Sequence, residues 1–347
     1  MQENYSQVLE RNLALFEKVN NGLLLDCGGI DVLNGLPPSF TGFTTLHSVY
    51  QSDRNDRMEI GVVPPSEEPY DCVILLMPKS KQELAFRIAW LRAHLQPGAR
   101  VFLLGAKKEG VASGAKQLET LGSEPVKVDM ARHCQLWQTS LDVPGEPFVL
   151  SDWETITPVT TPFGKLKLCG LPGVFSTGSV DPGTQVLLKA LAEYMTVLLE
   201  RRKPVQGNLL DFACGAGIIA ACLKQRFPEL EVNGVDNSEL AIHCAKRTFE
   251  LNGLRGAFWR SDGLSDVSGR FKWVVTNPPF HTGVKTDYSV TERFISQIPH
   301  HMKRNGILML VANSFLNYPE LIRSELANCV TQHSDGKYAV YLSEKTP

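Results

Sequence analysis

The stretch Leu209-Leu210-Asp211-Phe212-Ala213, followed by Cys214-Gly215-Ala216-Gly217, decides the fold of this 347-residue chain. Its first five residues predict a buried strand, and the glycines after them predict a tight turn into a helix. Further along, a second strand, Trp273-Val274-Val275-Thr276, runs into Asn277-Pro278-Pro279-Phe280-His281. Because parallel strands end at the same edge of a sheet, we expect the two turns to lie side by side.

Strands alternate with helical stretches along the chain, which predicts an α/β fold with mostly parallel sheets. In the first half we expect strands at 23–26, 44–50, 59–63, 70–77 and 100–105, and helices at 4–19 and 81–94. In the second half we expect strands at 208–213, 230–236, 256–260, 271–276, 306–312 and 338–342, and helices at 185–201, 217–226, 238–251 and 287–302. Between the halves, 154–160 and 165–168 predict a hairpin.

The two halves of the chain repeat one another. Leu23-Leu24-Leu25-Asp26 parallels Leu209-Leu210-Asp211, and a strand ending before Pro78 parallels the strand ending before Pro279. Such repetition predicts two copies of one fold. The first copy lacks Gly-x-Gly after its aspartate and lacks asparagine before its proline, which indicates a scaffold that has lost its chemistry. The segment 143–183 is rich in Pro and Gly, and we place the domain boundary there, giving domains 1–150 and 151–347.

Bulk composition excludes several classes of protein. The net charge of −2 gives no overall attraction to nucleic acid; residues 1–150 carry 14 Lys and Arg against 18 Asp and Glu, and residues 151–347 carry 21 against 19. The eight cysteines are scattered, and no His or Cys grouping has zinc-site spacing, so we expect no metal and a reducing compartment. The polar N-terminal stretch is unlike a signal peptide, and no apolar run could span a bilayer. We therefore expect a cytoplasmic protein.

The first turn fits a nucleotide-like cofactor. Gly215 and Gly217 allow a tight turn and a close approach to a ligand, and the following helix offers free N–H groups. Asp236 ends the next strand, where an acid accepts hydrogen bonds from ribose hydroxyls.

Two cofactors compete for this turn. The run from Gly215 to Ala220 fits the dinucleotide pattern G-x-G-x-x-G/A, but the carboxylate of Asp211 disfavours a pyrophosphate. S-adenosylmethionine carries a sulfonium and an ammonium, which a carboxylate stabilises. Asp262-Gly263, after a further strand, could accept a hydrogen bond from an adenine amino group. A glycine-rich turn with no ligand is the third interpretation.

The second turn fits a planar amine. Pro278 and Pro279 lack N–H groups and fix φ, so the backbone carbonyls point in fixed directions. The side-chain oxygen of Asn277 and the Pro278 carbonyl can accept both hydrogens of an exocyclic NH₂, which favours the nucleophilic form of the nitrogen. Phe280 could stack on the target ring, and His281 could orient it or be merely structural.

At these residues the chain resembles the Rossmann-like S-adenosylmethionine methyltransferases that carry an Asn-Pro-Pro-[Phe/Tyr] motif. That group modifies adenine N6, cytosine N4, glutamine side chains and guanine N2. Three further features narrow the resemblance to the bacterial ribosomal RNA small subunit methyltransferase C family: the runs Leu171-Pro172-Gly173-Val174-Phe175-Ser176 and Val311-Ala312-Asn313-Ser314-Phe315-Leu316, and Asp181 with Gly183. It covers nearly the whole chain and is strongest over 171–317. Ala213 departs from the glycine usual in the family.

The resemblance implies two tandem Rossmann-like methyltransferase-fold domains with seven-stranded sheets, the first degenerate. It implies methyl transfer from S-adenosylmethionine to N2 of a guanine in 16S rRNA, either in the 30S subunit or in an assembly intermediate, by a monomer. The expected catalytic residues are Asn277, Pro278, Pro279, Phe280 and His281. The expected cofactor residues are Asp211, Ala213, Gly215, Gly217, Asp236, Asn237, Asp262, Gly263 and Asn277. The expected RNA-contacting residues are Phe175, Asp181, Lys79, Lys127 and Arg132.

Alternatives remain at this point. A sister family methylates guanine N2 in 23S rRNA and shares the two-copy layout. A protein glutamine N5-methyltransferase uses a similar turn without the upstream copy. A nicotinamide-dependent enzyme and a non-enzymatic RNA-binding protein are the rivals from other classes. In the first domain, solvated surface charges compete with an RNA-binding role, and its net charge of −4 (14 − 18) argues against a broad phosphate-binding face.

Overall fold

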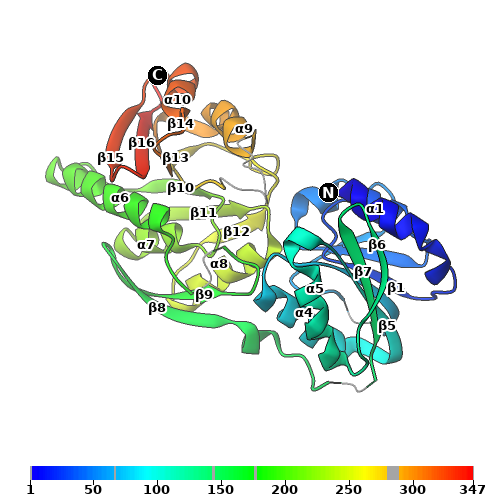
Figure 1. The fold of residues 1–347 in the computed structure, drawn as a ribbon. Coiled ribbons are helices and arrows are strands. Elements are labelled where there is room, and N and C mark those ends of the chain that lie inside the picture. The colour runs from blue at the N-terminus through cyan, green and yellow to red at the C-terminus, as the bar shows by residue number, and fades with distance from the viewer. Residues whose placement is uncertain (1, 66–67, 143–144, 176–177, 280–288, 347) are drawn as a thin grey trace. The chain divides into compact units, whose positions relative to one another are not determined.

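The computed structural model describes residues 2–65, 68–142, 145–175, 178–279 and 289–346. The chain divides into two compact units, Met1–Trp153 and Glu154–Pro347 (Figure 1). The predicted boundary was after residue 150. No helix within the described ranges combines the length and apolar character needed to cross a bilayer.

The first unit is built on a seven-stranded sheet with the strand order β3-β2-β1-β4-β5-β7-β6. The strands are β1 Gly22–Leu25, β2 Phe40–Thr44, β3 Met58–Ile60, β4 Tyr70–Leu76, β5 Leu95–Ala106, β6 Val126–Ala131 and β7 Cys134–Ser140. The α-helices are α1 Gln2–Arg11, α2 Ile30–Asn34, α3 His47–Gln51, α4 Lys81–His94 and α5 Val111–Gln117. Every pairing is parallel except those of β7 with β5 and β6.

The second unit repeats this sheet with the order β12-β11-β10-β13-β14-β16-β15. Its strands are β10 Gly207–Phe212, β11 Leu230–Asp236, β12 Ala257–Arg260, β13 Phe271–Thr276, β14 Met302–Asn313, β15 Val330–Ser334 and β16 Tyr338–Glu344. Its α-helices are α6 Pro182–Glu200, α7 Ile218–Arg226, α8 Glu239–Leu251, α9 Ser289–Gln297 and α10 Tyr318–Leu326. A separate hairpin pairs β8 Thr155–Thr161 with β9 Gly164–Gly170. The predicted fold of two seven-stranded, mostly parallel α/β domains is confirmed.

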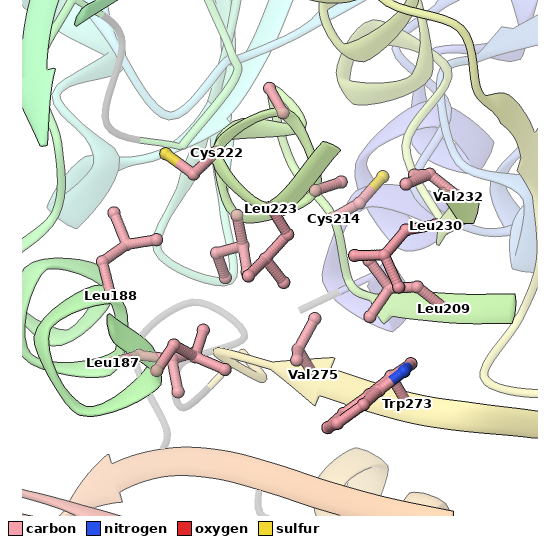
Figure 2. Close-up of a cluster of buried hydrophobic side chains, with 14 of the residues drawn as sticks. Leu187, Leu188, Leu209, Cys214, Cys222, Leu223, Leu230, Val232, Trp273 and Val275 are labelled. Carbon is pink, nitrogen blue, oxygen red and sulfur yellow. The ribbon is translucent and has the colours of Figure 1, made fainter. Parts of the chain in front are cut away.

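Side chains of the central strands alternate between two apolar layers, one on each face of the sheet. Leu209 and Val275 belong to one buried cluster, while Leu210 and Val274 belong to another. Figure 2 shows the first cluster, with Leu187 of α6 facing the strands. Burial on both faces explains why these strands are continuous apolar runs in the sequence. All eight cysteines of the chain are free and buried in such surroundings.

Several predicted elements differ from the structure. The helix expected at 4–19 ends at Arg11 and is followed by a 3-10 turn at Leu13–Leu15. The predicted strand at 44–50 ends at its first residue, because the Thr44 hydroxyl accepts a hydrogen bond from the Leu46 N–H at 3.1 Å and α3 begins at His47. The predicted helix at 287–302 contains α9, which gives way at Ile298 to a 3-10 turn, and Met302 already begins β14. Pro299 sits at the start of that turn, where its missing N–H removes an α-helical hydrogen bond.

The structure also corrects the alignment of the two copies. Ile74 pairs with Leu24 in β1, and Val275 pairs with Asp211 in β10. Ile74 and Val275 are equivalent positions, because each lies four residues before the matching proline, Pro78 or Pro279. Their partners are therefore equivalent too. Asp211 corresponds to Leu24, and Asp26 corresponds to Ala213. The backbone agrees, since Asp26 and Ala213 both adopt a positive φ, 59° and 55°. The carboxylate of the second copy therefore has no counterpart in the first.

Candidate active site

The two turns singled out in the sequence lie next to each other at one edge of the second sheet. Strands β10 and β13 are parallel neighbours, with Phe212 opposite Thr276. The Thr276 hydroxyl donates to the Phe212 carbonyl at 2.8 Å, which ties the two strand ends together. The first turn begins one residue after Phe212, and Asn277 follows Thr276 directly.

The first turn is built from residues with positive φ. Ala213, Gly215 and Gly217 have φ values of 55°, 53° and 76°. In this conformation a Cβ is sterically costly, so Ala213 stands where glycine would fit with less strain. A Cβ at Gly215 would meet no atom within 4 Å, so this side of the turn is open to a ligand.

Gly217 has a packing role in addition. A Cβ there would lie 3.1 Å from the Cβ of Ala245 on α8. We therefore expect Gly217→Ala to lower the free energy of unfolding by about 1–3 kcal/mol, through backbone strain and the close contact together. Thermal or denaturant unfolding measures the loss.

Gly253→Ala is the matched control, because Gly253 also has a positive φ, 65°, but a Cβ there meets no atom within 4 Å. It should cost only the backbone strain, about 1 kcal/mol. Equal losses in the two variants would contradict the packing role of Gly217.

Asp211 lies beneath the turn and is fully buried. One carboxylate oxygen accepts the Ala220 N–H at 3.1 Å, and the other, Oδ1, has no hydrogen-bond partner among the described residues. Burial is the largest influence and raises the pKa of Asp211 to about 8, with a further increase from Asp236; the Ala220 N–H acts in the opposite direction. An unpartnered, desolvated acceptor fits a cationic ligand group such as an ammonium.

Asp236 stands at the end of β11. Its Oδ2 accepts the Gly215 N–H and its Oδ1 accepts the Ser238 N–H, both at 2.9 Å. Burial raises the pKa of Asp236, and the backbone N–H groups of Ser238, Gly215 and Asn237 oppose that increase. Each carboxylate oxygen keeps a further lone pair with which it could accept a ribose hydroxyl.

Asp262 and Gly263 follow β12 at the same edge of the sheet. The Asp262 carboxylate lies 3.7 Å from the Arg293 guanidinium of α9, and Gly263 has a φ of 61°. Asp262 and Arg293 line a cavity of about 260 Å³. The other lining residues are Leu264, Ser265, Gln297, His300 and His301.

Asn277 is held by two contacts across the site. Its side-chain Nδ2 donates to Asp181 Oδ2 and to Thr184 Oγ1, each at 2.9 Å. Pro278 is buried and Pro279 is exposed. Phe280 and His281, which were expected to stack on and orient the target, lie outside the described residues.

A second cavity, of about 60 Å³, joins the first turn to Asn277. Its walls include Ala213, Gly215, Asp181 and Thr184, together with Phe175, whose side chain is 73% exposed. The sequence did not single out the wall formed by hairpin residues Leu168, Cys169 and Gly170.

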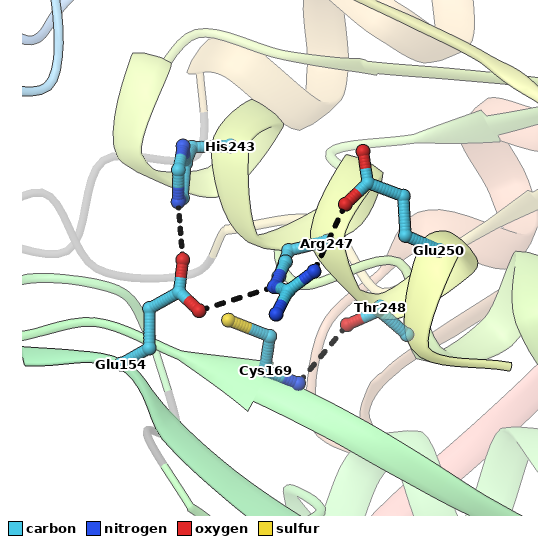
Figure 3. Close-up of polar contacts among 6 residues, drawn as sticks. All are labelled: Glu154, Cys169, His243, Arg247, Thr248 and Glu250. Carbon is cyan, nitrogen blue, oxygen red and sulfur yellow. Dashed lines mark hydrogen bonds and ion pairs between the residues drawn. The ribbon is translucent and has the colours of Figure 1, made fainter. Parts of the chain in front are cut away.

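The hairpin is fixed to α8 by polar contacts, which Figure 3 shows. Glu154 accepts from His243 Nε2 at 2.9 Å and from Arg247 Nε at 3.2 Å, and the Cys169 N–H donates to the Thr248 hydroxyl at 3.1 Å. These contacts hold one wall of the cavity against a helix of the same unit. They join residues that are 79 to 93 positions apart, so no local pattern in the sequence indicates them.

The three basic residues expected to contact RNA lie in the first unit. Lys79 follows β4, Lys127 is on β6 and Arg132 is in the turn between β6 and β7; all three are exposed. The Lys127 ammonium lies 5.2 Å from the centre of the Trp137 ring. Lys127 and Arg132 belong to the same hairpin of β6 and β7, whereas Lys79 follows a different strand.

Comparisons with known proteins show which family the chain resembles. Two family models match: "Methyltransferase small domain N-terminal" over residues 6–156 and "Methyltransferase small domain" over residues 165–342. A ribosomal RNA small subunit methyltransferase C from Aeromonas hydrophila is 39% identical, covering 98% of this chain and 97% of the other. One from Pseudoalteromonas atlantica is 35% identical, covering 97% of each.

A solved structure shares the fold of the whole chain. It is the 16S rRNA N2 methyltransferase of T. thermophilus in complex with AdoMet and guanosine, with a TM-score of 0.86, 23% identity, and coverage of 98% of this chain and 91% of the other.

The paired α/β domains, the glycine turn over a buried acid and the Asn-Pro-Pro turn beside it define an S-adenosylmethionine-dependent methyltransferase. At 35–39% identity over almost its full length, the chain belongs to the ribosomal RNA small subunit methyltransferase C family.

Proposed function

We propose that this protein transfers a methyl group to the exocyclic N2 of a specific guanine in 16S rRNA. The observation that carries the proposal is the adjacency of Asn277 to the glycine turn, at the ends of two paired strands. The small-subunit names of the full-length relatives favour 16S over 23S rRNA, and an rRNA substrate over a protein glutamine.

The cofactor side is formed by residues that fit S-adenosylmethionine, which when bound supplies an electrophilic methyl group on a sulfonium. Asp211 would pair with the ammonium through its unpartnered oxygen, and Asp236 would accept ribose hydroxyls. Asn237, Asp262 and Gly263 would border the adenine. Gly215 leaves the turn open to the ligand.

On the substrate side, Asn277 Oδ1 and the Pro278 carbonyl would each accept one N–H of the guanine amine. Both acceptors keep the nitrogen lone pair out of the ring and directed at the methyl group. The two acceptors would hold the amine while it takes up the methyl group that the cofactor would supply, and the surplus proton of the amine would pass to water. Phe280 would stack on the guanine and His281 would help to orient it.

The target base must leave its stack to reach this pocket. Two strongly exposed aromatic rings at the second unit, Phe175 (73%) and Phe315 (74%), would stack on bases of the RNA near the site. Lys79, Lys127 and Arg132 would give the first domain an RNA-contacting role in addition to its scaffold role. The enzyme would act in the cytoplasm, as a monomer, on the 30S subunit or an assembly intermediate.

The test is direct methylation by the purified protein. With S-adenosylmethionine carrying an isotopically labelled methyl group, we expect N2-methylguanosine in 16S rRNA or 30S subunits, detected by mass spectrometry of nucleosides and mapped by nuclease fragments. Equal amounts of 23S rRNA and 50S subunits are the control. Label appearing only in the large subunit, or in another nucleoside, would overturn the proposal.

A further inference from the structure

The side-chain amide of Asn277 has two chemically different ends, and only one suits an amine. The oxygen accepts hydrogen bonds, whereas the NH₂ group can only donate them. If the NH₂ group faced the guanine amine, two hydrogen-bond donors would oppose each other and no hydrogen bond could form between them. The proposed chemistry therefore requires other residues to fix the orientation of this amide, since asparagine does not fix it by itself.

Two neighbouring side chains fix the orientation of the Asn277 amide. Both hydrogens of Asn277 Nδ2 are engaged, one by Asp181 Oδ2 and one by Thr184 Oγ1, at 2.9 Å each. A carboxylate can only accept hydrogen bonds, so Asp181 admits the nitrogen end of the amide and repels the oxygen end. The amide oxygen is then the only end left for a substrate.

Both acceptors are fixed in turn by the first turn of helix α6. Asp181 is the N-cap of α6, and its Oδ2 also accepts the Thr184 N–H at 3.0 Å. Thr184 is 6% exposed. A Cβ at Gly183 would lie 3.0 Å from Asp181 Oδ2 and 3.3 Å from the Tyr338 ring, so this turn is closely packed. The N-terminus of α6 thus holds the two acceptor oxygens in fixed positions.

We propose that Asp181 and Thr184 are positioning residues that hold the Asn277 amide with its oxygen toward the substrate. This inference rests on the proposed function, in which Asn277 accepts from the guanine amine. It gives Asp181 a role different from the RNA contact expected from the sequence. It also supplies selectivity, because an acceptor-only face admits the N2 amine of guanine and repels its O6 carbonyl.

The decisive variant is Asp181→Asn. Asparagine caps helices as well as aspartate, so the helix start is preserved, but an amide NH₂ can now replace one carboxylate oxygen and favour a flipped Asn277. We expect kcat to fall by about 10- to 100-fold, the range of one hydrogen bond to a charged group. The dissociation constant of S-adenosylmethionine, measured by calorimetry, and the melting temperature should stay close to those of the wild type.

Variants of Thr184 test the second acceptor independently of Asp181. Thr184→Val keeps the shape and removes the acceptor, so it should lower kcat, whereas Thr184→Ser keeps the hydroxyl and should restore it. Ser80→Ala is the control for a loss of stability at a helix start outside the site, since Ser80 caps α4 in the first unit by accepting the Glu83 N–H. It should lower stability slightly and leave kcat unchanged.

The outcomes separate the two proposals. If wild-type protein makes N2-methylguanosine and Asp181→Asn and Thr184→Val keep wild-type kcat, the positioning role is wrong and the proposed function stands. A fall in kcat that Ser80→Ala reproduces would also overturn it. If wild-type protein makes no N2-methylguanosine, the proposed function itself fails.

Discussion

An Asn277→Ala variant should bind S-adenosylmethionine normally and transfer methyl groups about 10²- to 10³-fold more slowly than the wild type. The alanine removes the oxygen that accepts one N–H of the target amine, and this interaction matters most as the nitrogen becomes nucleophilic. It also leaves Asp181 and Thr184 without a shared donor, but neither belongs to the cofactor turn. Single-turnover kinetics on 30S subunits, with calorimetry for the cofactor, measure the two properties separately.

Asp236→Ala is the reciprocal variant. Asp236 accepts the Gly215 N–H and shapes the cofactor turn, so its loss should weaken S-adenosylmethionine binding, and a saturating concentration should recover much of the rate. The division of roles between the two turns is wrong if both variants lose cofactor affinity and rate to the same extent.

The second large effect concerns Asp211 and pH. Burial raises its pKa to about 8, so in the free enzyme this acid is largely protonated at neutral pH. A cationic ligand group favours the carboxylate, so binding should release a proton, and the dissociation constant of S-adenosylmethionine should fall as pH rises from 6 toward 8 and level off above it. Calorimetry in buffers of different ionisation enthalpy measures the proton released.

Asp211→Asn provides the comparison, since its amide oxygen can still accept the Ala220 N–H. We expect this variant to bind S-adenosylmethionine on the order of tenfold more weakly at pH 8 and to lose the part of the pH dependence that Asp211 contributes. The difference between wild type and variant cancels titration of the ligand itself. An unchanged pH profile in the variant would show that another group carries the effect.

The same group affects the stability of the free enzyme. Because the folded-state pKa lies above the ordinary 3.8, the folded state holds more protons than the unfolded state between about pH 4 and pH 8. The contribution of Asp211 is therefore absent below that window, becomes increasingly unfavourable through it, and stays constant above it. The Asp211→Asn variant should lack this slope in denaturant unfolding.

The sequence predicted the central strands well because they are buried on both faces and appear as uninterrupted apolar runs, as in Phe271–Thr276. Strands β6 and β15 were missed for the converse reason. They lie at the sheet edges, and Val126–Ala131 and Val330–Ser334 contain no buried residue. Without a buried face, the alternation that marks a strand is absent from the sequence.

The sequence predicted the part of the site that lies at the ends of the strands. The adjacency of Asn277 to the glycine turn follows from the parallel sheet. The contacts that orient it do not, since Asp181 and Thr184 are 96 and 93 positions away and only the packed helix end brings them to the amide. The resemblance between Asp26 and Asp211 misled for a similar reason, because matching letters do not reveal strand register.

The burial of all eight sulfur atoms has a practical consequence. Desolvation disfavours the thiolate forms of Cys72 and Cys222, whose pKa values rise to about 12. Alkylating reagents and maleimides are electrophiles that react with thiolates, so the native chain presents them with almost no reactive group. A single cysteine introduced at an exposed position would then be the main site of labelling by a fluorophore. Docking onto ribosomal particles could be followed in real time without first replacing the native cysteines.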